Sequence, residues 1–284
     1  FIENCIFNEQ NTGNFVFVDN QSPNLTLYFL NCSLLNKNSQ TNTRFLYSIS
    51  EDVTIDSCSF VQPAGSISQM QAIRIYLTSS SIGSFSFINN DVFNAINRFI
   101  GLYLYQTPIF ANNTFHDFNR NRSYFMDVTL SWPLNSFLFE NNTYRNIVGG
   151  ADYNGGIATW VQSSSRTNQI TIEFIHCTFI NVTNIYPGRN LIPLEYRCQG
   201  GVFQHGFSPS ISNSSLIFNS CIFNDNGING CGGALAFEIL GDLAIINCSF
   251  ISNKAKLNSQ VVGCLSNGGA IFLANSSSIN SQSP

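Results

Sequence analysis

The stretch Ile245-Ile246-Asn247-Cys248-Ser249-Phe250 contains the motif that decides the fold of the whole chain. In this motif an apolar residue is followed three positions later by Cys or Asn, and two positions after that by a second apolar residue. The motif occurs nine times, with central residues 27, 26, 32, 23, 29, 35, 44 and 27 positions apart. A fixed motif at variable spacing indicates one structural unit repeated with loops of different length. The central residues are Cys5, Cys32, Cys58, Asn90, Asn113, Asn142, Cys177, Cys221 and Cys248.

Short apolar or alternating runs next to the motif predict β-strands, for example over 52–55, 169–174 and 215–218. Residues two apart in a strand share a face, so the spacing of three from Ile55 to Cys58 interrupts the alternation. Asp56 and Ser57 are therefore expected to turn a corner that keeps both flanking strands apolar on the inside. The Gly pairs at 232–233 and 268–269 predict a further bend with positive φ before a third strand.

One coil is thus expected to hold three short strands, each paired with its copy in the next coil. This predicts an all-β fold, a right-handed parallel β-helix solenoid of about nine to ten coils. Residues 1–284 would form a single β-helix domain, a segment of a longer repeat protein, because both ends interrupt a repeat. An antiparallel sandwich is the alternative, but it would not explain a constant corner.

The nine central residues are expected to form a core ladder inside the coils. A buried Asn must satisfy its amide, and bonding to the next coil would do so. A buried Cys acts as a small apolar residue. We interpret this ladder as structural, because no paired His or acidic residue accompanies the thiols as metal ligands would require.

The composition limits the classes of partner. The net charge is −4 and charged residues make up only 10 % of the chain, where about a quarter is usual. No basic patch is visible, so nucleic acid is not an expected partner. No run of 18 apolar residues occurs, so no membrane span is expected. We predict no cofactor and no metal.

Three of the nine cysteines lie outside the motif, each shortly before a Gly pair. Cys231 and Cys264 fall at similar bends in adjacent coils and are candidates for a disulfide. Cys198 could compete for either partner. An odd number of cysteines excludes complete pairing within the chain.

Asn-x-Ser/Thr sequons predict N-linked glycans on the outside of the coils. Four of them occupy the residue just before the central position, which the strand alternation turns outward: Asn31, Asn112, Asn141 and Asn247. Asn20, whose sequon precedes Pro23, is the weakest. The predicted glycosylation sites are Asn24, Asn31, Asn112, Asn121, Asn141, Asn181, Asn213, Asn247 and Asn275.

Two kinds of motif carry a family likeness. The segments 223–226 and 250–253 read FxxN, and the segments 232–235 and 268–271 read GGA[LI]. Over residues 216–275 these motifs resemble the repeats of the chlamydial polymorphic membrane protein family. That resemblance implies a parallel β-helix of the pectin-lyase-like type, with a role in surface display and adhesion.

These observations favour an extracellular or cell-surface structural glycoprotein whose stacked coils form a rod, fibre or coat. Its expected partners are its own glycans and either further repeats of the same chain or a second copy joined end to end. One alternative is an adhesin for a carbohydrate or cell-surface ligand. A second is a polysaccharide lyase or hydrolase, but the carboxylates are scattered, so we predict no enzyme and no catalytic residue. Asp91 and Asp117 lie one coil apart, as do Asp127 and Asp152, but no Asp-Asp pair occurs.

Overall fold

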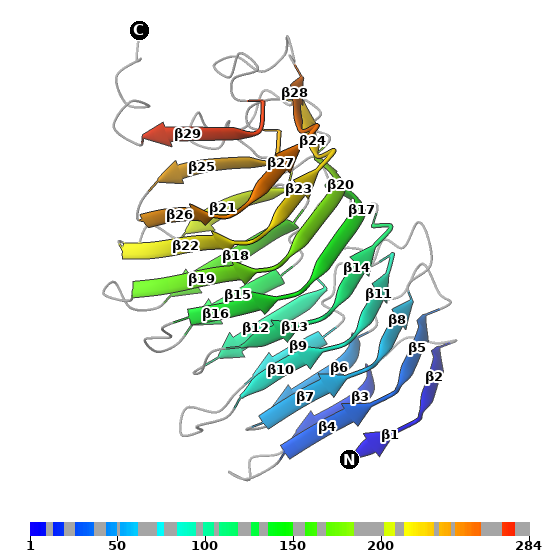
Figure 1. The fold of residues 1–284 in the computed structure, drawn as a ribbon. Helices are drawn as coiled ribbons and strands as arrows, with labels where there is room; N and C mark the ends of the chain where they lie inside the picture. Colours follow the sequence, from blue (N-terminus) through cyan, green and yellow to red (C-terminus); the bar gives the residue numbers. More distant parts are fainter. Residues whose placement is uncertain are drawn as a thin grey trace, which may run out of the picture.

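The computed structural model shows a stack of coils that runs from the N-terminus to the C-terminus (Figure 1). Every strand in the described residues belongs to one of three parallel sheets, and those residues contain no helix. This confirms the predicted all-β parallel β-helix with three strands per coil. The structure describes residues 1–9, 14–19, 26–36, 44–49, 52–61, 73–76, 84–94, 99–104, 108–118, 126–130, 136–149, 157–163, 169–184, 202–207, 213–229, 233–239, 242–256 and 269–275.

Sheet A holds the strand that precedes the central residue in each coil. Its members pair in register, so that Phe87 lies between Ile55 and Phe110. The strands are β1 (Ile2–Glu3), β4 (Thr26–Leu30), β7 (Asp52–Asp56), β10 (Phe85–Ile88), β13 (Ile109–Ala111), β16 (Ser136–Glu140), β19 (Gln169–Ile175), β22 (Asn213–Asn219) and β26 (Asp242–Ile246).

Sheet B holds the strand that follows the central residue. Its strands are β2 (Ile6–Glu9), β5 (Ser33–Asn36), β8 (Ser59–Val61), β11 (Asp91–Phe93), β14 (Thr114–His116), β17 (Thr143–Gly149), β20 (Thr178–Asn184), β23 (Ile222–Asn224) and β27 (Ser249–Ile251). Two short strands extend this sheet beyond β23 and β27, namely β24 (Gly227–Asn229) and β28 (Lys254–Lys256), and β24 also pairs with β20.

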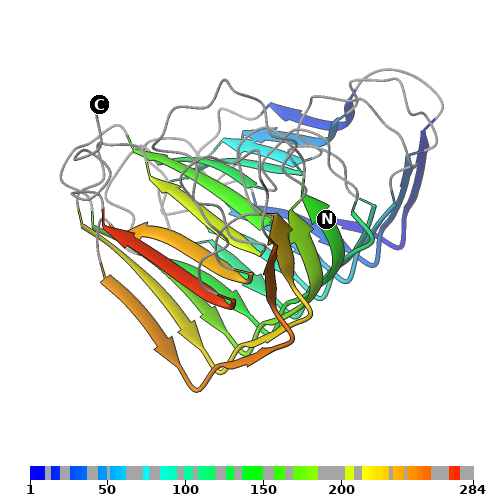
Figure 2. The same cartoon turned by 90° about the horizontal axis from the view of Figure 1, so that it is seen from above.

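Sheet C closes each coil. Figure 2 shows sheets A and B meeting at a sharp corner, with sheet C facing that corner across the interior. Its strands are β3 (Asn14–Asp19), β6 (Arg44–Ile49), β9 (Ile73–Tyr76), β12 (Ile100–Leu104), β15 (Met126–Leu130), β18 (Ile157–Ser163), β21 (Phe203–Phe207), β25 (Leu235–Ile239) and β29 (Ile271–Asn275).

The corner between sheets A and B differs in detail from the two-residue turn that the sequence predicts. Asp56 is still part of β7, and the chain turns at Ser57, whose φ is 54°. The residue in this position has positive φ in every coil: Asn4, Asn31, Ser57, Asn89, Asn112, Asn141, His176, Ser220 and Asn247. Six of these nine are Asn, the side chain that tolerates the left-handed region best after Gly. We call this position the first corner.

The Gly pairs also act differently from the prediction. Neither Gly233 nor Gly269 has positive φ, so that expectation is wrong for both of these residues. A Cβ on Gly233 would instead overlap the carbonyl oxygen of Gly269 and the backbone of Lys254. Gly233 is therefore required by the close approach of neighbouring coils. Gly269 has open space where its Cβ would lie.

Stacked aromatic rings fill much of the core behind the first corner. On the sheet A side, Phe110, Phe139, Phe174 and Phe218 stack with successive centroid distances of 4.9, 4.6 and 5.1 Å. A second column on the sheet B side has centroid distances of 5.0, 5.1, 4.8 and 4.7 Å. It consists of Phe115, Tyr144, Phe179, Phe223 and Phe250. Aromatic side chains in register thus repeat the same packing from coil to coil.

Candidate functional site: side-chain columns at the two corners

Asn side chains bridge adjacent coils inside the first corner. Oδ1 of Asn113 accepts the backbone N–H of Asn90 at 2.9 Å, and Nδ2 of Asn113 donates to the carbonyl of Phe87 at 2.8 Å. Asn142 repeats the pattern on the coil of Asn113, with 3.0 Å from the backbone nitrogen and 2.8 Å to the carbonyl of Phe110. Each amide therefore supplies hydrogen bonds at the point where the turn interrupts the strand ladder.

Cys side chains occupy the same inner column in the other coils. Sγ of Cys58 accepts the N–H of Cys32 at 3.4 Å, and Sγ of Cys248 accepts the N–H of Cys221 at 3.4 Å. Burial raises the pKa of the Cys58 thiol to about 12, and the hydrogen bond with Cys177 together with burial raises that of Cys221. Because sulfur is a weak hydrogen-bond acceptor, these thiols bond the next coil less strongly than an amide does, and their raised pKa values make them poor nucleophiles.

The structure places all nine central residues on the inside of the coil. Seven are buried, whereas Cys5 in the first described coil and Cys248 in the last are partly exposed. The six cysteines of this column are free thiols. The arrangement can hold coils in register, and its seven buried members present no reactive group to solvent.

A second corner within sheet B was not predicted from the sequence. The residue four positions after the central one again has positive φ, at Asn94, Asp117, Asn146, Asn181, Asp225 and Ser252. In the last two of these coils an inward Asn follows directly. Asn226 accepts the N–H of Val182 at 2.9 Å, and Asn253 accepts the N–H of Asn226 at 3.1 Å. The FxxN motif thus builds a second inner ladder, and its constant spacing from the central residue was the available signal.

The predicted glycosylation sites fall into three groups. Five have exposed side chains at a left-handed corner: Asn31, Asn112, Asn141, Asn181 and Asn247. Asn213 begins β22 and Asn275 ends β29. Asn24 and Asn121 lie outside the described residues, as does Asn20.

The outward side chains of the first corner also bond from coil to coil. Nδ2 of Asn112 donates to Oδ1 of Asn89 at 3.1 Å, and Nδ2 of Asn89 donates to Oδ1 of Asp56 at 2.8 Å. Ser57 donates to the same carboxylate oxygen at 2.9 Å. This outer chain of amides therefore ends on a carboxylate.

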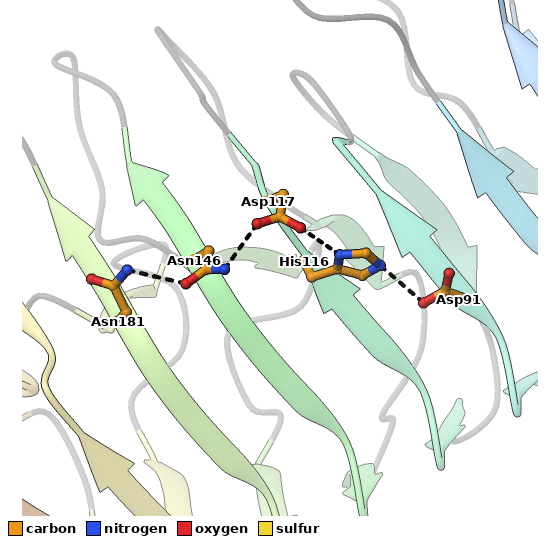
Figure 3. A network of polar contacts seen from close by, with 5 residues as sticks. All are labelled: Asp91, His116, Asp117, Asn146 and Asn181. Carbon is orange, nitrogen blue, oxygen red and sulfur yellow. Dashed lines mark hydrogen bonds and ion pairs between the residues drawn. The ribbon is translucent and has the colours of Figure 1, made fainter.

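Figure 3 shows the corresponding network on the outside of the second corner. Asn181 donates to Oδ1 of Asn146 at 3.1 Å, and Asn146 donates to Oδ1 of Asp117 at 2.9 Å. The His116 ring continues the network, with Nδ1 at 2.7 Å from Oδ2 of Asp117 and Nε2 at 3.1 Å from Oδ1 of Asp91. The two carboxylates noted in the sequence are thus joined through one imidazole.

Hydrogen bonds from His116 and Asn146 hold the pKa of Asp117 below its ordinary value, and the positive charge of Arg145 adds to the effect. Asp117 is therefore ionised over the neutral range, where it fixes the direction of the amide chain. His116 is only 12 % exposed, while the side chains of Asp91 and Asp117 are 56 % and 41 % exposed. The ring is therefore a bridge between the two carboxylates.

Cys231 and Cys264, the disulfide candidates, lie outside the described residues, as does Cys198. Within the described ranges, no group of three or more His, Cys, Asp or Glu side chains is arranged to hold a metal ion. A search of the same ranges for a helix with the length and apolar character of a membrane span finds none.

No family model, no curated protein and no solved structure matches this chain. The likeness to the chlamydial repeats therefore depends on the FxxN and GGA[LI] motifs alone. The structure adds a physical meaning to them, since Asn226 and Asn253 form the second inner ladder and Gly233 permits close coil stacking.

Proposed function

We propose that the chain is a structural glycoprotein of the cell surface or extracellular space, in which stacked coils form a rod. The observation that carries this proposal is the continuity of the columns. Inner Asn and Cys side chains bond each coil to the next, and aromatic rings stack behind them. In a solenoid each coil contacts only its neighbours, so bonds repeated at every step give axial stiffness.

The exposed sequons support the glycoprotein part of this proposal. Asn31, Asn112, Asn141 and Asn247 lie in one outward column at the first corner. Glycans on such a column would cover one edge of the rod and keep copies from packing there. The resemblance to the chlamydial repeats is consistent with display at a surface.

The rod is proposed to continue axially, either into further repeats of the same polypeptide or into a second copy. By the pattern of the inner column, a coil stacked beyond Cys248 would accept the Cys248 N–H and donate to the carbonyl of Ile245. Partly exposed core residues such as Ile245 and Phe250 would then become buried. Any such coil must therefore carry Cys or Asn at its central position.

Electron microscopy of the purified native protein tests the proposal. Rods or filaments with a repeat of about 4.8 Å along the axis are expected, since this is the spacing of paired strands. Enzymatic removal of N-glycans followed by mass spectrometry tests the second half. Compact isolated particles without glycans would overturn the proposed function.

A second candidate is an adhesin. Its support is that apolar side chains are exposed on the outer face of sheet B, at Phe93 (37 %) on β11 and at Ile222 (42 %) and Ile251 (51 %) on the paired strands β23 and β27. Phe93 packs against His116 with a centroid distance of 5.3 Å, next to the carboxylates of the second corner. A glycan array separates the two candidates, because only an adhesin would bind a defined carbohydrate, and loss of that binding in Phe93→Ser would locate it here. Turnover of a polysaccharide in the same assay would instead favour the lyase or hydrolase alternative.

A further inference from the structure

One contact in the network of Figure 3 depends on protonation. The His116 ring lies between Asp117 of its own coil and Asp91 of the preceding coil, with a carboxylate oxygen within 2.7 Å of Nδ1 and another within 3.1 Å of Nε2. A carboxylate oxygen accepts, so each contact is a hydrogen bond only when the facing nitrogen carries a proton. A neutral imidazole carries one such proton and an imidazolium carries two. Both bonds therefore exist together only in the imidazolium.

We propose that His116 forms a proton-dependent link between β11 and β14. The link is present while the ring is doubly protonated and is lost when the ring gives up one proton. The remaining proton stays on Nδ1, because the contact to Asp117 is the shorter of the two and joins adjacent residues. Nε2 then directs a lone pair at the Asp91 carboxylate. The contact between coils changes from attractive to repulsive, while the contact within the coil persists.

The charges around the ring agree with this direction of change. In the described residues the charged groups facing His116 are Asp91 on β11, Asp117 after β14 and Arg145, its register partner on β17. Arg145 keeps its charge throughout, so it adds no pH dependence of its own. Phe93, also on β11, packs against the ring and carries no charge. The lowered pKa of Asp117 keeps the acceptor of Nδ1 ionised in mild acid. Release is thus expected as the pH rises and the ring gives up one of its two protons.

The effect should be local. Each coil contacts only its neighbours, so loss of one link opens that corner without unfolding the rod. The backbone N–H of Asn94 donates to the carbonyl of His116 at 3.0 Å and spans the same two coils. The hydrogen exchange of this amide therefore reports whether the link between His116 and Asp91 is formed.

The experiment measures exchange protection of the Asn94 amide by NMR in the full chain, at pH 6 and pH 8, for the wild type and for His116→Gln. At pH 6 the wild type is expected to be roughly twofold to fivefold better protected than the variant, the range for a partly exposed ion pair. At pH 8 the ratio should fall to one or below. A ratio that is the same at both pH values would mean that His116 contributes only packing, and would overturn the proposal.

Two further variants make the result specific. Asp91→Asn keeps the shape of the side chain but removes the negative charge, so it should reduce the pH response of Asn94. A full wild-type response in Asp91→Asn would also contradict the proposed link between His116 and Asp91. His176→Asn is the matched control, because His176 is exposed at the first corner, where Asn is the commonest residue. It should behave as the wild type, and a lost response there would place the titrating group elsewhere.

Discussion

Oδ1 of Asn142 lies 3.0 Å from the backbone nitrogen of Asn113 and 2.9 Å from its Nδ2. One buried oxygen thus accepts both hydrogen bonds that the preceding coil offers at the corner. Because the two residues are 29 positions apart, this relation links coils and not chain neighbours. It explains why the central position holds Asn or Cys in every copy of the motif.

Asn113→Ala is expected to be among the costly single changes. It leaves the N–H of Asn90 and the carbonyl of Phe87 without their side-chain partner in a buried corner. At about 1–3 kcal/mol for each of these two unsatisfied buried groups, the loss should be roughly 2–6 kcal/mol in chemical denaturation. Asn113→Cys should cost less, because Cys fills this position in other coils. Equal losses for the two variants would contradict a hydrogen-bonding role.

The column thiols are expected to resist alkylation in the folded chain. Cys58 is buried and its pKa is raised to about 12, so its thiolate fraction at pH 8 is very small. Mass spectrometry after treatment with iodoacetamide should find Cys32, Cys58, Cys177 and Cys221 unlabelled. The same sample in denaturant is the control and should be labelled at all four. Native labelling of Cys58 at the denatured rate would show that the column is open.

Asn141 tests the left-handed corner. Its φ is 52° and its side chain is exposed. Asn141→Gly should be close to neutral, whereas Asn141→Val should lose about 1–3 kcal/mol, because a β-branched residue is strained in this region. Both variants remove the sequon, so the comparison is independent of any glycan. Similar unfolding midpoints for the two would mean that the corner relaxes.

Gly233 and Gly269 form a matched pair for coil spacing. A Cβ on Gly233 would overlap backbone atoms of the next coil, whereas Gly269 has open space at the same place in its own coil. Gly233→Ala should therefore lower the unfolding temperature by several degrees, since backbone must shift, while Gly269→Ala should change it little. The reverse order in thermal denaturation would contradict the close approach of these coils.

Asp117 predicts a dependence on acid. A pKa below the ordinary value in the folded chain means that the carboxylate stabilises the fold above the unfolded pKa of about 3.9. That contribution is lost as the pH falls through the folded pKa. The unfolding midpoint of Asp117→Asn should therefore lie below that of the wild type at pH 7 and approach it in strong acid. A constant difference across this range would show that the charge of Asp117 does not stabilise the fold.

Particular residues show how far the sequence could be interpreted. The motif around Cys248 predicts the strand on either side, the corner, and the inward direction of the central side chain. These features follow from the alternation of residues along a single strand. The turn at Ser57 instead of Asp56–Ser57 could not be derived, because a break in alternation shows that the chain turns but not which φ values it adopts. The role of Gly233 depends on backbone 36 residues later in the chain.

The sequence by itself determined the repeated unit, its strands and the residues that point inward, because each depends on spacings of two to three residues. Only the tertiary structure decided which outward side chains meet. His116 contacts Asp91 across 25 positions, and Asn226 contacts Val182 across 44. The loops between coils vary in length, so the register between coils, and with it the outer polar network, is settled only when the backbones stack.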